Sequence, residues 1–254
     1  AKSRFGELLV KNCKEEEIVY VQPRRGFAGI SLAHLCKKYN KKLTLIMPSS
    51  KSASEHQRLC VELGAEARFL RVAAMPNAGS MAKKYADSVG AFFVPLGLKH
   101  ELVTACAVKS LVDFFKGKEH PKRLWCTIST GVLARSLQIA LPNTEFYSVA
   151  VSRNIQKGEL GNSKFYSYHK PFSSLSDMIP DDFDCENSYD SKCWHYMNDK
   201  LYLTTYAGKV LLQHTEAPTD FIPIVQFKNY SDEHHFWGKG EPEIVEPLAV
   251  GTAI

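Results

Sequence analysis

Residues 125–151, WCTISTGVLARSLQIALPNTEFYSVAV, decide the fold of this chain. The stretch opens with an apolar run, Trp125–Ile128, that suits a buried strand. Val132–Leu141 then has the apolar spacing of a helix, which a Pro-Asn pair ends, and Phe146–Val151 is a second apolar run. The pattern predicts one βαβ unit, in which a loop of small residues precedes the helix.

That loop, Ser129-Thr130-Gly131, is a candidate anion site. A loop of small residues at the start of a helix presents backbone N–H groups to an anion, and the helix dipole adds to the attraction. A phosphate group is the obvious guest. Ser129 and Thr130 equally suit the simpler role of helix caps, and the stretch alone leaves both readings open.

Strands and helices alternate through the chain before this unit. We expect helices over 4–13, 30–39, 53–63, 81–89 and 101–115, and strands over 18–21, 43–47, 67–70 and 92–94. This alternation predicts a mainly parallel sheet with helices on both faces. Ligands of such sheets bind at the carboxyl ends of the strands, so the loops to examine are QPRRGFAG (22–29), PLGL (95–98) and STG (129–131).

The composition of the sequence changes after Arg153. Residues 156–184 are rich in Ser, Pro and irregularly spaced aromatic residues, which predicts a long ordered loop or flap. A helix over 189–197 and a final strand over 209–214 follow. We expect three parts: a smaller α/β domain in 1–95, a second α/β part with the flap in 96–227, and a tail in 228–254.

Composition is that of a soluble globular protein, with 44% hydrophobic and 23% charged residues and a formal charge of +5. No run approaches the roughly 18 apolar residues of a membrane span, and the polar N-terminus is not a signal peptide. The seven cysteines are odd in number and form no C-x-x-C pair, which favours reduced thiols in the cytoplasm. The nine histidines lack zinc-like spacing, so we expect no metal site.

Several separated pieces carry a family resemblance. They are AKSRFGELL (1–9), LCVELGAEARFL (59–70), GAFFVPLGLKHELVTACAVKSL (90–111), TISTGVLARSL (127–137), NSYDSKCW (187–194) and KVLLQHTEAP (209–218). Together they resemble fold type II pyridoxal-phosphate enzymes, in the aminocyclopropane-carboxylate deaminase and D-cysteine desulfhydrase branch. The resemblance implies a three-layer α/β/α architecture, tryptophan synthase beta-like, with pyridoxal 5'-phosphate as cofactor.

The resemblance also implies roles for individual residues. AKSRFGELL is similar to the family motif N-K-x-R-K-x-E-x-L-L, whose lysine forms the Schiff base, so Lys2 is expected to hold the cofactor. Tyr189 is expected to transfer protons and Asp190 to bind the ring nitrogen, with Thr215 a second residue near the ring. The residues expected to bind the 5'-phosphate are Ser129, Thr130, Gly131, Val132 and Leu133.

Each role has a plainer alternative. Terminal lysines are usually solvated, which is the simple reading of Lys2. Asp190 suits the start of a helix, where the dipole favours a carboxylate, and Thr215 suits the end of a strand. For Ser129 and Thr130 the alternative remains helix capping.

The loop 22–29 departs from the family pattern. The family has a Ser-Asn pair there, in which Ser acts near the substrate and Asn bonds the cofactor's ring hydroxyl. Gly26 and Phe27 take these places and supply neither group. Arg24 and Arg25 precede them, and guanidinium groups suit carboxylate or phosphate recognition. These four residues are candidates for binding a larger or more anionic substrate, or else a surface feature beside a site that no longer binds well.

Three functions follow as hypotheses. The first is a pyridoxal-phosphate enzyme acting at the α-carbon of an amino acid or amino-acid-like group by elimination, deamination or decarboxylation. The second is a decarboxylase or lyase acting on an amino-acid adduct of a nucleobase in phage DNA, which the arginine pair and the positive charge favour. The third is a degenerate, non-catalytic relative with a binding role, which Gly26 and Phe27 favour. Relatives suggest a homodimer, and the cysteine usage described above favours the cytoplasm.

Overall fold

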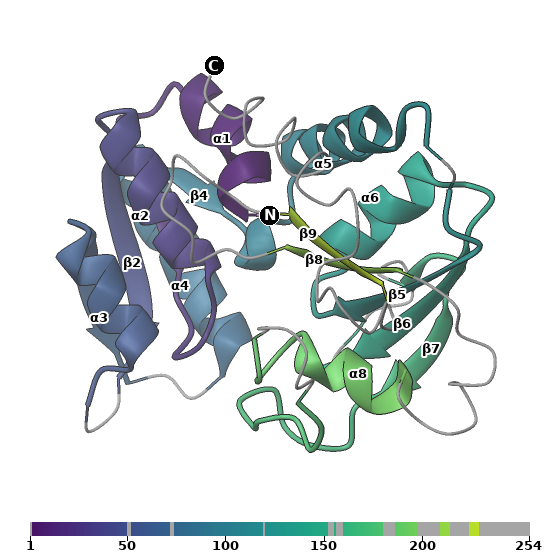
Figure 1. The fold of residues 1–254 in the computed structure, drawn as a ribbon. Coiled ribbons are helices and arrows are strands. Elements are labelled where there is room, and N and C mark those ends of the chain that lie inside the picture. The colour runs from purple at the N-terminus through teal and green to yellow at the C-terminus, as the bar shows by residue number, and fades with distance from the viewer. Residues whose placement is uncertain are drawn as a thin grey trace. The chain divides into compact units, whose positions relative to one another are not determined.

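A computed structural model describes residues 2–49, 52–71, 74–118, 120–151, 155, 160–179, 186–197, 209–213 and 224–228. The chain divides into two compact units, Ala1–Cys106 and Ala107–Ile254, and each is described by itself. The division falls within helix α5 (Glu101–Phe115), whereas the sequence suggested a boundary at residue 95. Figure 1 shows the elements of both units.

The first unit contains a four-stranded sheet in the order β3-β2-β1-β4, and every pair is parallel. Its strands are β1 (Glu17–Val21), β2 (Lys42–Pro48), β3 (Glu66–Leu70) and β4 (Phe92–Val94). The central strand β1 is almost wholly buried after its first residue, as expected of a parallel strand covered on both faces. The loops that follow β1 and β4 therefore leave the same edge of the sheet side by side.

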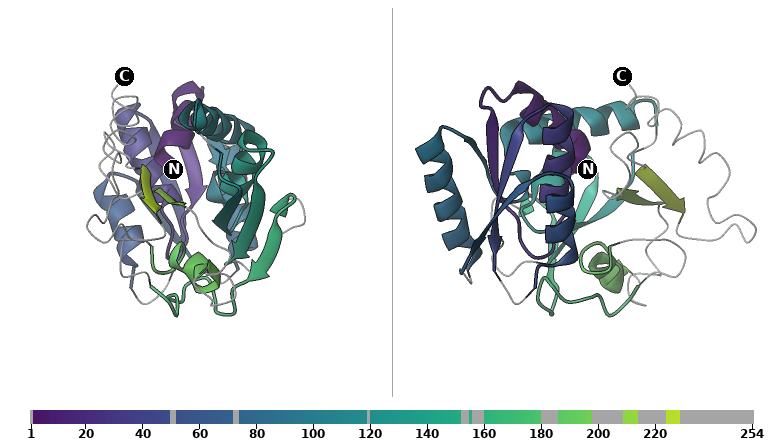
Figure 2. Two further views of the ribbon diagram at one scale, coloured as in Figure 1. Left: turned by 45° about the vertical axis from the view of Figure 1, so that its right-hand side comes forward. Right: turned by 90° about the vertical axis from the view of Figure 1, so that its left-hand side faces the viewer.

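Helices cover both faces of this sheet (Figures 1 and 2). Helix α4 (Met75–Val89) packs three alanines, Ala78, Ala82 and Ala86, against the β1 and β2 side chains on one face. Helix α2 (Ala28–Lys38) covers the other face, with α1 (Lys2–Asn12) and α3 (Glu55–Glu62) packed beside it. The predicted three-layer α/β/α arrangement is confirmed in this unit.

Helix α4 begins earlier than the sequence suggested. It starts at Met75 rather than Met81, and Pro76 lies in its first turn. A proline is tolerated there because the first N–H groups of a helix have no partner within the helix. Because the early part of α4 consists mainly of small and polar residues, the sequence there shows no apolar spacing typical of a helix.

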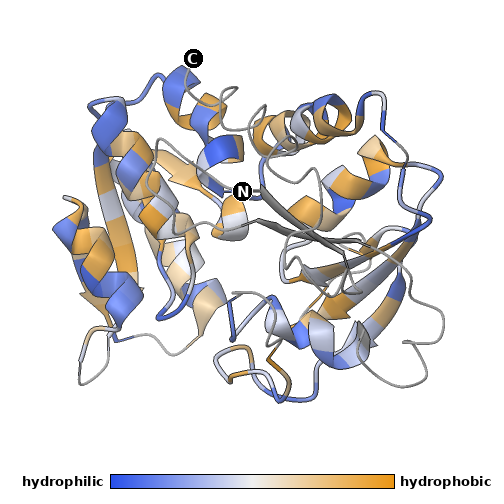
Figure 3. Cartoon of the chain, viewed as in Figure 1, coloured by the Kyte–Doolittle hydropathy of each residue, from blue (hydrophilic) through white to orange (hydrophobic). Residues whose placement is uncertain are grey.

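The second unit is built on the predicted βαβ stretch. Strands β5 (Arg123–Ile128) and β6 (Glu145–Ala150) pair in parallel on either side of α6 (Val132–Ala140), as expected. Helix α6 and the end of α5 pack on one face of the sheet, and α8 (Ser191–Met197) packs on the other. Figure 3 shows apolar residues along these strands and alternating apolar and polar bands along the helices.

Two expectations for the later part of the chain are wrong. The segment 156–184 is not only a loop, because β7 (Lys164–Ser167) extends the sheet as a third parallel strand beside β6. Its Phe165 is 46% exposed, so this edge strand lacks the apolar pattern that identifies buried strands. Strand β8 (Lys209–Gln213) is not the last one, since it pairs antiparallel with β9 (Ile224–Lys228). Each of these strands is fixed by pairing with another strand.

Buried acidic groups make the first unit sensitive to alkaline pH. Burial raises the pKa of the Cys36 and Cys60 thiols from 9.0 to about 12, and that of the Tyr20 hydroxyl from 10.0 to about 12. The folded unit keeps these protons after the unfolded chain has released them. Stability is therefore fully present below pH 9 and falls as the pH rises toward 12, by about 1.4 kcal/mol per pH unit for each group.

Urea unfolding followed by circular dichroism at pH 8, 9, 10 and 11 measures this loss. We expect the midpoint to fall progressively above pH 9, and the fall to be shallower in Cys60→Ala because one titrating thiol is gone. Midpoints that stay constant up to pH 11 would contradict the assignment of these groups as buried acids.

Candidate functional site

The loop after β1 is organised by one buried side chain, Gln22, which is fully inaccessible to solvent. Its Oε1 accepts a hydrogen bond from the Gly29 N–H at 3.0 Å, and its Nε2 donates to the carbonyls of Gly26 at 2.8 Å and Pro23 at 3.1 Å. A Cβ on Gly29 would lie 2.2 Å from that oxygen, so glycine is required there. Gln22 thus fixes both ends of the loop.

The amino end of α3 holds the same loop from its other side. Ser54 caps α3 in a capping box with Gln57, and its hydroxyl donates to the Arg24 carbonyl. The Gly26 N–H donates to Nδ1 of His56 at 3.2 Å, and the rings of Phe27 and His56 lie 4.7 Å apart. The loop after β1 is therefore clamped to the start of α3.

The four predicted substrate-binding residues occupy this clamped loop. Arg24 is exposed, and its Nη1 donates to the Ser52 carbonyl at 2.9 Å. Arg25 is exposed. Gly26 has φ +148°, a conformation that other residues rarely adopt, and Phe27 is the N-cap of α2 without a side-chain capping bond. The Arg24 guanidinium group thus helps to hold the loop to residue 52, whereas the Arg25 side chain is exposed to solvent.

Lys2 is the first residue of α1 and is partly buried. The glutamate of its motif, Glu7, fixes α1 to the end of α2, because its Oε1 accepts from Tyr39 Oη at 2.6 Å and Lys38 Nζ at 2.9 Å. A Cβ on Gly6 would lie 3.3 Å from Leu98 in the loop after β4 and 3.5 Å from Leu35 of α2. Lys2 therefore extends from a helix with a defined position in the first unit.

In the second unit the Ser-Thr-Gly turn ends β5 and starts α6. Gly131 is the N-cap of α6, with φ +73° and no side-chain capping bond. The alternative in which Ser129 or Thr130 caps the helix is therefore wrong. The first backbone N–H groups of α6, including those of Val132 and Leu133, have no partner within the helix. One turn into α6, Nε of Arg135 is buried without a hydrogen-bond partner among the described residues.

Tyr189 lies at the same end of β5. Its hydroxyl donates to the Thr127 carbonyl at 3.3 Å and interacts with the Ser129 backbone N–H. Burial raises its pKa well above 10.0, and the neighbouring acidic groups, including Asp190, add to this shift. The hydroxyl consequently stays protonated at neutral pH. Asp190, which directly precedes α8, lies near Tyr189 and Cys126.

The structure thus gathers Tyr189, Asp190 and the turn from Ser129 to Leu133 in the second unit, while Lys2 and the loop 22–29 belong to the first. Thr215 lies outside the described residues, as does His214.

Sequence reasoning missed three side chains that the geometry singles out: His56, Arg135 and Lys192. Lys192 is fully buried in α8, and its Nζ donates to the Phe172 and Pro171 carbonyls at 2.9 and 3.2 Å. A capping box at Ser54 was visible as S-x-x-Q, but its contact with loop 22–29 is long-range. No sequence signal marks Lys192 as buried.

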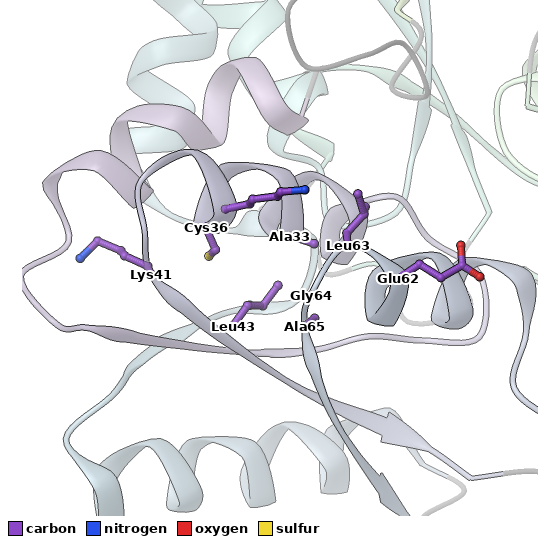
Figure 4. A pocket seen from close by; sticks show the side chains of 9 residues that line it. Ala33, Cys36, Lys41, Leu43, Glu62, Leu63, Gly64 and Ala65 are labelled. Atoms are coloured by element: carbon purple, nitrogen blue, oxygen red, sulfur yellow. The ribbon is translucent and has the colours of Figure 1, made fainter.

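A pocket lies in the first unit at the amino ends of strands β2 and β3, away from the loop 22–29 (Figure 4). It is lined by Cys36 and Lys37 near the end of α2, by Leu43 near the start of β2, and by Gly64 and Ala65 just before β3. Because ligands of parallel sheets bind at the carboxyl ends of the strands, we do not assign this pocket as the functional site. Among the described residues, no group of three or more His, Cys, Asp or Glu is placed to hold a metal ion.

None of the helices that the structure describes has the length and apolar composition needed to cross a membrane.

Comparison with solved structures identifies the fold. The chain is similar to an "ACC deaminase homologue" with a TM-score of 0.68 and 14% identity, covering 78% of this chain and 72% of that one. It is similar to Escherichia coli diaminopropionate ammonia lyase with a TM-score of 0.50 and 12% identity, covering 65% and 55%. It is also similar to threonine deaminase isoform 2 from Solanum lycopersicum, with a TM-score of 0.50 and 13% identity, covering 59% and 46%.

The fold is that of fold type II pyridoxal-phosphate enzymes, which confirms the architecture expected from the motifs. The chain spans about half the length of the lyase and of the plant deaminase. No protein-family model matches the sequence, and a search of curated proteins finds no match.

Proposed function

We propose that this chain is a pyridoxal-phosphate-dependent enzyme acting at the α-carbon of an amino acid or amino-acid-like substrate. The observation that carries the proposal is the edge of the second unit where the glycine-capped turn of α6 meets Tyr189. This turn offers backbone N–H groups without helical partners, and Arg135 adds a buried Nε that has no hydrogen-bond partner among the residues the structure describes. Such donors fit a phosphate ester.

The chain's own residues have distinct roles in this proposal. Lys2 holds the cofactor, Asp190 bonds its ring nitrogen, and the turn from Ser129 to Leu133 binds its phosphate. Tyr189 is the proposed proton-transfer residue, and because burial raises its pKa it remains protonated and does not act as a base at neutral pH. When bound, pyridoxal phosphate supplies an electron sink for the α-carbon. Elimination, deamination and decarboxylation all use this sink, and the fold is shared by lyases and deaminases.

Titration of the purified protein with pyridoxal phosphate tests the proposal. We expect an absorbance band near ~420 nm from the Schiff base, and its loss in Lys2→Ala. Lys11→Ala is the matched control, since Lys11 is an exposed lysine of the same helix, and it should retain the band. A wild-type protein without any band would favour the non-catalytic alternative, in which the chain keeps the fold and a binding role only.

A second candidate function keeps the cofactor and changes the substrate to an amino-acid adduct of a nucleobase in DNA. The exposed Arg25 and the formal charge of +5 favour it. Anisotropy of labelled duplex DNA should then show binding that weakens steeply between 50 and 200 mM salt and weakens further in Arg25→Ala. Absence of binding at low salt would rule out this candidate and leave a small amino-acid-like substrate. We also propose that the protein is cytoplasmic and forms a homodimer, and light scattering of the purified chain tests the dimer.

A further inference from the structure

The Gly26 backbone fixes the tautomer of His56. The Gly26 N–H donates to Nδ1 at 3.2 Å, so Nδ1 must carry a lone pair. In a neutral imidazole the proton then resides on Nε2, which makes Nε2 a hydrogen-bond donor. Within the described part of the chain no hydrogen bond to Nε2 is found, and Nε2 is not one of the buried side-chain atoms that lack a partner, so it is accessible to solvent. His56 thus offers an N–H to a ligand.

His56 is also held in orientation. The ring packs on Phe27 with 4.7 Å between ring centroids, and its backbone lies in the first turn of α3, which Ser54 and Gln57 cap. Gln22 fixes the loop on the far side of Gly26 through its bond to the Gly26 carbonyl. A donor held in this way loses little side-chain entropy when it binds a ligand.

The position of His56 matters because of what loop 22–29 lacks. Gly26 and Phe27 occupy the positions where the resembled family has a serine hydroxyl and an asparagine amide, and neither residue can hydrogen-bond through its side chain. His56 contacts both of them from the first turn of α3, the helix that follows the adjacent parallel strand β2. The segments that follow β1 and β2 leave the same carboxyl edge of the sheet, where ligands of parallel sheets bind.

We propose that His56 donates a hydrogen bond from Nε2 to the ring hydroxyl oxygen of pyridoxal phosphate, which makes it a cofactor-binding residue. The inference rests on the proposed function. A ring hydroxyl that ionises beside a Schiff base is a strong acceptor, and a neutral N–H is a suitable donor to it. His56 thereby supplies the hydrogen bond that Gly26 and Phe27 cannot.

Two substitutions separate the ligand role of His56 from its structural one. In His56→Asn the amide oxygen can still accept from the Gly26 N–H near the place of Nδ1, but the Nε2 donor is lost. In His56→Gln the longer amide can reach the place of Nε2 and restore a donor. Both variants are compared with wild type in affinity for pyridoxal phosphate and for 3-deoxypyridoxal phosphate, which lacks the ring hydroxyl.

We expect His56→Asn to bind pyridoxal phosphate about tenfold more weakly but to bind the deoxy analogue as wild type does. The pH midpoint of the Schiff-base band should also rise by about one unit. Removing the external donor leaves the ring oxygen more charge to share with the protonated imine, which then keeps its proton to higher pH. His56→Gln should restore most of both properties.

Equal weakening for both cofactors, or an unchanged pH midpoint in His56→Asn, would show that His56 only braces the loop and would overturn the inference. In that case the band near ~420 nm remains in wild type and the proposed function stands. A wild-type protein that forms no band overturns both proposals, so the two failures are distinguishable.

Discussion

Replacing Lys192 by methionine is expected to destabilise the second unit by about 3 kcal/mol. Methionine has nearly the same length and fills the same space, so the loss comes from hydrogen bonding. The Phe172 and Pro171 carbonyls lose the Nζ donor at 2.9 and 3.2 Å, and each buried acceptor left unsatisfied costs roughly 1–3 kcal/mol. The substitution also removes the ammonium that lies 5.1 Å from the centre of the Tyr168 ring, and with it a cation–π interaction.

Urea unfolding followed by tryptophan fluorescence measures this effect, since Trp125 of β5 and Trp194 of α8 both pack against the apolar cluster between α8 and the sheet. The matched control is Lys109→Met, because Lys109 is 77% exposed and pairs with Asp113 on the surface of α5. Its midpoint should stay near that of wild type. A wild-type midpoint in Lys192→Met would show that the buried lysine does not stabilise α8.

Replacing Gln22 by leucine should release the loop that carries Arg24 to Phe27. Leucine is close in size but leaves the Gly29 N–H and the Gly26 and Pro23 carbonyls without their partner. We expect a destabilisation of about 3 kcal/mol, as for other buried polar groups left unsatisfied. Gly29→Ala should act on the same bond, since its Cβ would lie 2.2 Å from Gln22 Oε1.

Hydrogen exchange monitored by mass spectrometry is the direct measurement, because it reports the amides of residues 22–32. Both variants should exchange faster in this peptide than wild type, whereas Arg25→Leu, an exposed change in the same loop, should not. Unchanged protection in Gln22→Leu would mean that the contacts with α3 suffice to hold the loop.

Most of the fold could be predicted from the local spacing of apolar residues along the sequence. The β5-α6-β6 unit was readable from Trp125 to Val151 because two parallel strands, buried from Cys126 and from Phe146 onward, and an amphipathic helix each leave a strong signal. The glycine of the Ser-Thr-Gly turn was likewise readable, and φ +73° at Gly131 gives the physical reason for it.

Features that depend on long-range contacts were not readable. Strand β7 is a partly exposed edge strand, defined by its pairing with β6 rather than by its composition. The importance of His56 arises from a hydrogen bond to Gly26, thirty residues earlier. Lysine is usually a surface residue, and Lys192 is buried through contacts with residues far from it in the sequence, among them Tyr168, Pro171 and Phe172. When contacts between distant parts of the chain determine the burial or hydrogen bonding of a side chain, the sequence around that residue does not reveal it.

Chemical trapping tests most directly whether Lys2 binds pyridoxal phosphate covalently. The protein is incubated with the cofactor, reduced with borohydride, digested and mapped by mass spectrometry. We expect a phosphopyridoxyl group on the peptide that contains Lys2, attached to Lys2, with no comparable label on Lys11 or Lys192. Label on another lysine, or none at all, would contradict it.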